Sequence, residues 1–430
     1  MAIFGRHVFK LEFKQIAALM FGTLFGQIVT FLASPILSRL YSPQEFGLFG
    51  TFIAAVTIIS SVSSLRFDMA ISLPEDIRES ISVALVGLIS SIVFSIFTLV
   101  CLVLSLDKLT AFVGDSSSLY YLLIVPAYVL IVSTNQLCSQ LNLRKSEYGL
   151  QAKIRSLQSL LTAGFSILFS GAGIGALGLV VGSFVSQSLI STFQVGQIIK
   201  TSATDVLSES VGLIKKSFKK YRRFPFYQVP ATLFETFTSY LPLLILAPQF
   251  GAKSAGFFFL AQSVVRVPVV FLSKAVGDVF RQKASRQFAA SGECREVFLK
   301  TFRMTSLVAA PLFAIFGLLG PVIFALVFGD EWRESGEYAR LMCLMFAFQF
   351  VASPLSAIFT VAEKLAHDMA FQVLTFISVG IAFAVGAFIF GDVKTTVFLY
   401  GAVYSIRYAL QIYYAYKYSR GGVAVVIKWK

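Results

Sequence analysis

The sequence has very few of the residues on which enzymes and metalloproteins depend. Its 430 residues include two histidines and four cysteines, and charged side chains make up only 13% of the chain. His7 and His367 lie outside the long apolar segments, and the cysteines lack the spacing of a zinc site. No phosphate-binding glycine loop of the Walker type is present. We therefore expect no catalytic residues, no metal and no cofactor, and the protein is predicted not to be an enzyme.

Apolar residues dominate what is present. They account for 57% of the chain, and the mean hydropathy is +0.79. A soluble domain has about a quarter of its residues charged, so lipid must be the solvent for much of this surface. A membrane-spanning helix needs roughly 20 apolar residues. Segments of this kind lie at Ile16–Leu40, Phe46–Leu65, Ser80–Leu106, Leu119–Leu141, Ile154–Ser170, Ile174–Ile199, Phe226–Gln249, Ala255–Val276, Thr305–Phe328, Tyr338–Ala362, Met369–Phe390 and Thr395–Tyr416.

These segments are continuous rather than alternating in polarity, which favours helices over the strands of a β-barrel. The sequence predicts an all-α polytopic membrane protein with about 12 transmembrane helices in two six-helix lobes. The N-terminal lobe covers residues 1–199 and a basic cytoplasmic linker covers 200–225, which contains the run KKSFKKYRR. The C-terminal lobe covers 226–417, followed by a cytoplasmic tail at 418–430. Two equal halves joined by a linker are common in transporters.

Basic residues are distributed unevenly between the predicted loops. Most of the 36 lysines and arginines fall in every second gap, and the densest groups lie at 200–223 and 274–303. Positively charged loops stay in the cytoplasm, so both termini are predicted to be cytoplasmic. The net charge of +14 is then mainly a topology signal, which argues against a nucleic-acid partner. Contact with anionic lipid headgroups is a second effect.

Three ionisable residues lie deep within predicted spans. They are Glu235, Arg266 and Arg407. Buried charges in a bilayer usually face a water-filled cavity or each other. Two cations and one acid would leave a cavity net positive, which favours an anionic substrate such as a phosphate. The alternative is that Glu235 pairs with one of the arginines and holds helices together.

Other polar residues are candidates for a gate or for sugar contacts. Two cation–acid pairs and one further arginine lie near helix ends: Arg66 with Asp68, Lys274 with Asp278, and Arg39. These residues either form a gate or the rim of the cavity, or they anchor the helices in the headgroup layer. Neutral polar side chains within spans either hydrogen-bond sugar hydroxyls or join helices: Gln27, Asn135, Gln136 and Gln262. Gly22 and Gly26 form a GxxxG pair, which indicates close packing within the bundle or a dimer face.

The segment ILSRLYSPQEFGLFGTFIAAVTIISSVSSLRFDMAISLPED (36–76) resembles the amino-terminal part of bacterial polysaccharide flippases of the Wzx type. These belong to the multidrug/oligosaccharidyl-lipid/polysaccharide exporter superfamily. The motifs that carry the resemblance are SRLYSPQEFGLF and LRFDMAISLP. The resemblance implies two lobes around a cationic cavity, which flip O-antigen-like repeat units linked to undecaprenyl diphosphate from the cytoplasmic to the periplasmic leaflet of the bacterial inner membrane.

The sequence is compatible with more than one energy source and more than one function. H⁺ or Na⁺ is a candidate coupling ion, with Glu235 as its site, and a downstream polymerase or chain-length machinery would be a partner in lipopolysaccharide assembly. One alternative is a cation-coupled multidrug antiporter of the same superfamily, whose cavity would be expected to be more acidic. A membrane-embedded polysaccharide polymerase or ligase is a weaker alternative, because no sizeable outward loop is found to hold catalytic groups.

Overall fold

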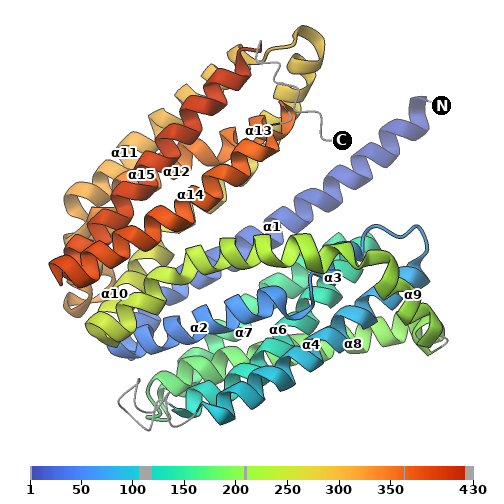
Figure 1. Ribbon diagram of the computed structural model, residues 1–430, viewed down its shortest axis with the longest axis horizontal. Helices are drawn as coiled ribbons and strands as arrows, with labels where there is room; N and C mark the ends of the chain where they lie inside the picture. Colours follow the sequence, from blue (N-terminus) through green and yellow to red (C-terminus); the bar gives the residue numbers. More distant parts are fainter. Residues whose placement is uncertain (1, 106–118, 208–210, 363, 422–430) are drawn as a thin grey trace. The chain divides into compact units, whose positions relative to one another are not determined.

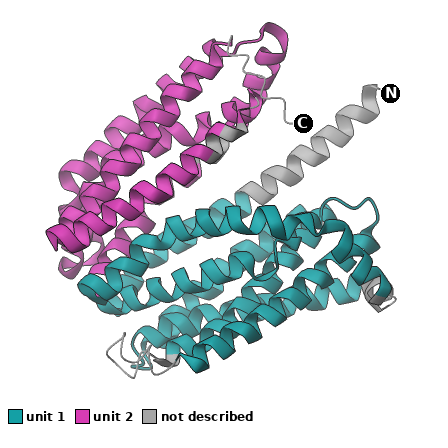
Figure 2. Cartoon of the chain, in the orientation of Figure 1, with its two compact units in different colours: residues 1–252 teal, residues 253–430 magenta. Residues whose placement is uncertain are grey.

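The computed structural model describes residues 2–105, 119–207, 211–362 and 364–421, with side chains omitted over 2–20 and at a few other positions. Helices make up nearly all of the described chain, and no strand occurs within it. The protein is all-α, and most of its described helices are long (Figure 1). Two compact units divide the chain, Met1–Ala252 and Lys253–Lys430 (Figure 2).

The first unit contains eight complete described helices and the first part of a ninth. They are α1 (Ala2–Leu40), α2 (Pro43–Ser63), α3 (Phe67–Ala70), α4 (Ile77–Leu104), α6 (Leu119–Arg144), α7 (Tyr148–Ser170), α8 (Ala176–Leu207), α9 (Val211–Tyr221) and the beginning of α10 (Arg223–Ser291). Helix α6 packs against α2, α4 and α8, and α7 lies between α1 and α8.

The second unit begins within α10. It continues with α11 (Arg295–Phe328), the 3₁₀ turn η2 (Asp330–Trp332), α12 (Arg333–Leu355), α13 (Ala357–Val361), α14 (Leu365–Ala384), the π-helical η3 (Val385–Phe390) and α15 (Val393–Ser419). Helix α12 packs against both α11 and α15, and α14 packs against α15. The backbone N–H of Cys294 donates to the carbonyl oxygen of Ser419 at 2.7 Å, which ties the start of α11 to the end of α15.

Nine helices among the described residues are long and apolar enough to cross a membrane. Helix α10 counts once among these nine although it bends into two segments at Gly251. Helices α7 and α15, of 23 and 27 residues, are long enough to span but more polar than the nine. If the two segments of α10 are counted separately and α7 and α15 are added, the described helices match the prediction of about twelve spans.

The predicted spans coincide with helices, but several helices extend well beyond them: α1 begins at Ala2 instead of 16, α11 begins at Arg295 instead of 305, and α10 ends at Ser291 instead of 276. Two separate helices were predicted at 226–249 and 255–276, and α10 does consist of two helical segments, which meet at Gly251. There φ is 85° and ψ is 157°, a conformation that is essentially restricted to glycine. The chain therefore turns at one residue, where a polar loop was expected.

The predicted linker at 200–225 is itself mostly helical. It holds the end of α8, the 11-residue α9 and the start of α10. The predicted C-terminal lobe begins at residue 226, whereas the second compact unit begins at Lys253, so 226–252 groups with the first unit through its contacts. The predicted tail at 418–430 lies mostly outside the described residues.

The motif SRLYSPQEFGLF forms the junction between α1 and α2. Ser42 caps α2 in a capping box: its hydroxyl accepts from the Glu45 N–H at 3.4 Å, and Glu45 Oε2 accepts from the Ser42 N–H at 2.6 Å. Pro43 occupies the first turn, where no N–H is needed. Tyr41 is buried, and its hydroxyl donates to the Ser166 carbonyl oxygen on α7 at 2.7 Å. The motif thus starts a helix and fastens it to a neighbour.

The GxxxG pair of α1 packs against α7. A Cβ on Gly22 would lie 2.6 Å from the Ala152 Cβ, and one on Gly26 would lie 2.7 Å from the Ser159 Oγ. Larger residues at these positions would push the two helices apart. Of the two readings of this pair, packing within the bundle is the one that the structure shows.

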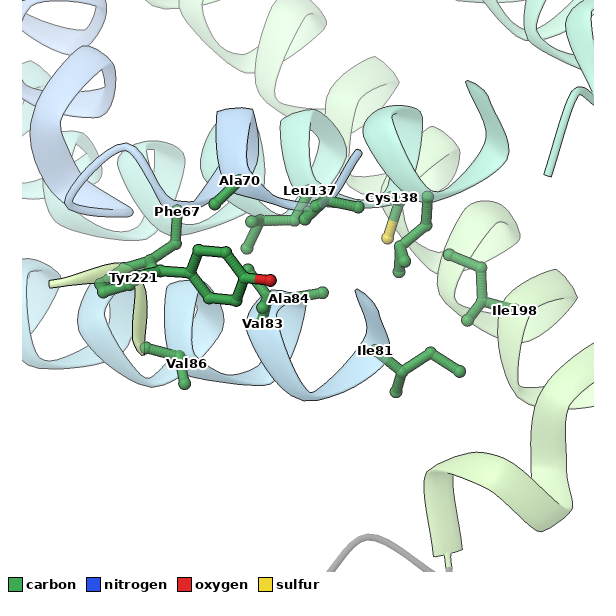
Figure 3. Packing of buried hydrophobic residues seen from close by; sticks show 12 residues of the cluster. Phe67, Ala70, Ile81, Val83, Ala84, Val86, Leu137, Cys138, Ile198 and Tyr221 are labelled. Carbon is green, nitrogen blue, oxygen red and sulfur yellow. The ribbon is translucent and has the colours of Figure 1, made fainter. Parts of the chain in front are cut away.

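Helix α9 packs against α4 at one end of the first unit. Its Tyr221 is buried beside Phe67 and near Val83 and Val86 of α4 (Figure 3). On the exposed side, Lys220 pairs with Glu79 of α4 at 2.5 Å, and the Tyr221 hydroxyl donates to the same carboxylate at 3.2 Å. Basic and apolar residues alternate at helical spacing, which is why this segment forms an amphipathic surface helix instead of a loop.

Candidate functional site

The structure gathers three predicted site residues around α15 in the second unit. Arg266 and Gln262 lie on α10, and Arg407 lies on α15. The amide nitrogen of Gln262 donates to the Tyr400 hydroxyl at 3.5 Å. Arg266, which is exposed, is close enough to the Tyr400 hydroxyl to interact with it electrostatically.

A ladder of tyrosines links these residues, and we define it as Tyr400, Tyr404 and Tyr408. Consecutive ring centroids are 4.9 Å and 5.8 Å apart, because residues four apart in a helix lie on one face. Both Arg266 and Arg407 interact electrostatically with Tyr404 and Tyr408. Sequence reasoning missed this ladder, although its i, i+4, i+8 spacing is visible in the chain.

Arg407 lines a polar pocket of about 310 Å³. The carbon of its guanidinium lies 4.5 Å from the centre of the Tyr408 ring, and its Nε atom is buried with no hydrogen-bond partner among the residues that the structure describes. Arg281 of α10 also lines this pocket, with hydroxyl and amide side chains that include Ser353, Ser356 and Gln411. The pocket therefore presents two cations and several hydrogen-bonding groups, and none of its lining residues is acidic.

An anion suits this arrangement. A guanidinium offers donors in a planar fork that matches phosphate or carboxylate oxygens. The unpartnered Nε of Arg407 is a buried donor that a ligand oxygen would satisfy. Hydroxyl and amide groups around it can bind further phosphate oxygens or sugar hydroxyls.

Glu235 belongs to the first unit, whereas Arg266 and Arg407 belong to the second. It is exposed on the first segment of α10, within the first unit. Its predicted pairing with an arginine, or with a coupling ion, stays a prediction.

The candidate rim residues differ in their surroundings. Arg66 Nη1 lies 3.6 Å from Asp68 Oδ2, and both side chains are largely buried. The Ser64 hydroxyl donates to the other oxygen of Asp68 at 2.9 Å. Arg39 is exposed in the last turn of α1, where a cation interacts favourably with the helix dipole. Asp278 is exposed on α10, and the side chain of Lys274 lies outside the described residues.

The polar residues of the first unit are mainly engaged between helices. The Asn135 amide donates to Gln187 Oε1 at 2.7 Å, and Gln194 donates to Asn135 Oδ1 at 3.2 Å, so these groups join α6 to α8. Gln136 is half-buried on α6. Gln27 of α1 is half-buried, with its Oε1 buried and without a partner among the described residues.

Arg155 is a further residue that sequence reasoning did not single out. It is half-buried on α7 and donates to the Thr23 hydroxyl of α1 at 2.8 Å. Arg155 is the second residue of the predicted span 154–170, at the edge of a basic gap. Because α7 begins at Tyr148, the structure places Arg155 inside the helix, packed against α1.

The comparisons with known proteins agree with this picture. A model of a family described as polysaccharide biosynthesis protein matches residues 36–337. The succinoglycan biosynthesis transport protein ExoT of Rhizobium meliloti (strain 1021) is 20% identical over 318 residues, which cover 73% of this chain. The match spans 62% of the Rhizobium protein.

Solved structures share the fold. The inward closed conformation of the lipid II flippase MurJ superposes with a TM-score of 0.73 at 13% identity, covering 93% of this chain and 87% of MurJ. An inward-facing multidrug resistance MATE transporter of the MOP superfamily gives a TM-score of 0.60 at 13% identity, covering 93% of both chains. With a family model that matches well over half of its length, and with the resemblance of residues 36–76 confirmed, the chain belongs to the polysaccharide biosynthesis protein family.

Proposed function

We propose that the protein is a flippase that moves oligosaccharide repeat units linked to undecaprenyl diphosphate from the cytoplasmic to the periplasmic leaflet of a bacterial inner membrane. The observation that carries this proposal is the cationic pocket at Arg281 and Arg407, next to the tyrosine ladder. A polysaccharide family and a cationic pocket together favour an anionic, sugar-bearing substrate.

Each part of such a substrate has a matching chemistry. The diphosphate would be neutralised by the arginines, and sugar hydroxyls would bind the hydroxyl and amide groups around them. The polyprenyl tail would stay in lipid while the polar head crosses by alternating access. Both termini would then be cytoplasmic, as the distribution of basic residues predicts.

Flipping alone is an equilibrium, so a direction needs an energy source. A gradient of H⁺ or Na⁺ with Glu235 as the ion site is one source, and removal of product by a polymerase with its chain-length machinery is another. In the second case the surrounding pathway would assemble a surface polymer such as lipopolysaccharide with its O-antigen.

The test is complementation of a flippase-deficient strain, scored by surface glycan and by accumulation of the lipid-linked intermediate. Arg407→Ala and Arg281→Ala should each lower surface glycan about tenfold, because each removes a cation that lines the pocket and a charge-assisted hydrogen bond to substrate is lost. Protein abundance in the membrane should stay at the wild-type level.

Arg333→Ala is the matched control. Arg333 is the exposed first residue of α12, where it pairs with Asp330 at 3.4 Å, so its loss should leave glycan unchanged. Normal glycan in both Arg281→Ala and Arg407→Ala would contradict the proposal.

A multidrug antiporter is the second candidate, favoured by the fold shared with MATE transporters. Substrates of that kind are cations, which two arginines in a pocket would repel. Cells that express the protein should therefore gain no resistance to cationic dyes. Clear resistance, together with failed complementation, would replace the flippase proposal by the antiporter.

A further inference from the structure

A second cavity lies away from the tyrosine ladder, between the C-terminal part of α10 and the beginning of α11. It is a groove of about 780 Å³. Phe280 is buried there, and its ring centroid lies 6.4 Å from that of Phe298, so two packed aromatic rings support the groove. Val276, Val279 and Met304 add apolar walls.

Cations occupy one end of this groove. Lys283 and Arg286 line it from α10, and Lys300 lines it from α11, while Glu296 is the one acidic lining residue. All three cations are exposed. The walls therefore carry a net positive charge.

Charge and apolar surface are separated along the groove. The two helices are joined at residues 292–294, and Lys283 and Arg286 lie nearer to this connection than Val276 does. At a rise of 1.5 Å per residue, Lys283 is about 10 Å along the helix from Val276. On α11, Lys300 is likewise nearer to the connection than Met304. One end of the groove is cationic, and the other end is apolar.

This gradient coincides with the predicted membrane boundary. The predicted spans end at Val276 and begin again at Thr305, and the basic gap between them is assigned to the cytoplasm. The apolar end thus lies at the edge of the hydrocarbon layer, and the cationic end lies at the depth of the lipid headgroups.

Gln287 provides an independent sign of a ligand. It lines the groove, and its Oε1 is buried with no hydrogen-bond partner among the described residues. A carbonyl oxygen only accepts hydrogen bonds, so it would be satisfied by a hydroxyl or amine of a bound molecule.

We propose that this groove binds an anionic glycerophospholipid whose headgroup carries hydroxyls, from the cytoplasmic leaflet. Its phosphate lies among Lys283, Arg286 and Lys300, and a headgroup hydroxyl donates to Gln287 Oε1. An acyl chain lies along the apolar end. Clusters of lysine and arginine at the membrane surface attract anionic lipids in this way. The lipid is a resident ligand, distinct from the transported substrate.

The test is native mass spectrometry of the full-length protein, titrated with phosphatidylglycerol or phosphatidylcholine. We expect one phosphatidylglycerol to be retained in preference to phosphatidylcholine. Lys283→Gln/Lys300→Gln should weaken this binding about tenfold or more, since two headgroup contacts are lost. Val279→Trp, which fills the apolar end and keeps every charge, should weaken it as well.

Arg295→Gln/Arg303→Gln is the matched control, with two exposed cations of the same helix hairpin that do not line the groove. It should retain the lipid like the wild type, and all variants should melt at similar temperatures. Equal weakening in groove and control variants would overturn the proposal in favour of general surface charge. Displacement of phosphatidylglycerol by lower concentrations of undecaprenyl phosphate would overturn it in favour of the transported lipid.

Discussion

Arg66 and Asp68 illustrate how a few residues hold a charge pair in an apolar protein. Leu65 and Arg66 both adopt left-handed backbone conformations, with φ of 50° and 61°, which turns the chain directly after α2. The turn places Arg66 Nη1 3.6 Å from Asp68 Oδ2, and Ser64 donates to the same carboxylate. Two left-handed residues that are not glycine are costly, so the surrounding contacts must stabilise them.

Replacing one partner of this ion pair should destabilise the protein more than replacing both. Asp68→Ala leaves the largely buried Arg66 uncompensated, and we expect a loss of about 3 kcal/mol, near the lower end for a broken buried pair. The double variant Arg66→Ala/Asp68→Ala should lose less than Asp68→Ala alone. Thermal unfolding in detergent measures all three variants. Equal losses in the single and double variants would show that the pair adds nothing.

Several helices begin with caps that satisfy their first N–H groups. Ser42 and Glu45 do so for α2, and Asp392 does so for α15, where its Oδ2 accepts from the Thr395 N–H at 2.7 Å and from the Thr395 hydroxyl at 2.6 Å. These bonds lower the pKa of Asp392, with the side-chain bond from Thr395 as the main cause. Helix α15 carries the tyrosine ladder and Arg407, so the cap at its first turn supports the helix on which the candidate site is built.

The Asp392 cap should be worth about 1 kcal/mol, the usual cost of replacing a capping residue by alanine. Its pKa is lower in the folded state, so the ionised cap stabilises the protein above the unfolded pKa of about 3.9. That contribution is lost as the pH falls through the folded pKa. Asp392→Ala should lower the melting temperature at pH 7 and abolish this part of the acid dependence.

Asp392→Asn is the informative control. Asparagine caps helices about as well as aspartate but does not titrate. It should melt near the wild type at pH 7 without the additional loss below pH 4. If Asp392→Ala and the wild type lose stability equally on acidification, another group is responsible.

At the scale of the whole molecule, Gly251 joins the two compact units. It lies inside α10 with φ of 85° and ψ of 157°, next to the division at Ala252 and Lys253. A Cβ at this position would meet no atom within 4 Å, so space does not require glycine here. The backbone conformation does, since side-chain-bearing residues rarely adopt it.

Gly251→Ala should therefore cost about 1–3 kcal/mol through backbone strain alone, and it should also reduce transport if α10 straightens. Gly164→Ala is the matched control, because Gly164 lies inside α7 with equally open surroundings. That change should be neutral or should stabilise by about 0.5–1 kcal/mol. Complementation and thermal unfolding together separate the two variants. Equal behaviour would contradict a special role for the bend.

Composition and residue order by themselves determined the membrane character, the approximate number of helices and the family. Apolar runs of spanning length, basic gaps and the SRLYSPQEFGLF motif are local features, and each has a local physical meaning, such as the capping box at Ser42. The break between residues 249 and 255 was predictable for the same reason. That Gly251 alone makes this break was not, and neither were the extensions of α1, α10 and α11 beyond their apolar runs, because helical residues outside the hydrocarbon layer need not be apolar.

Only the tertiary structure decided which polar residues share a site. Gln262 and Asn135 look alike in the sequence, yet one contacts the tyrosine ladder and the other joins α6 to α8. The Arg407 pocket is built from residues far apart in the chain, and the groove between α10 and α11 depends on how two consecutive helices fold against each other. A span is a property of consecutive residues, whereas a cavity depends on how faces of different helices meet, and that is settled by packing.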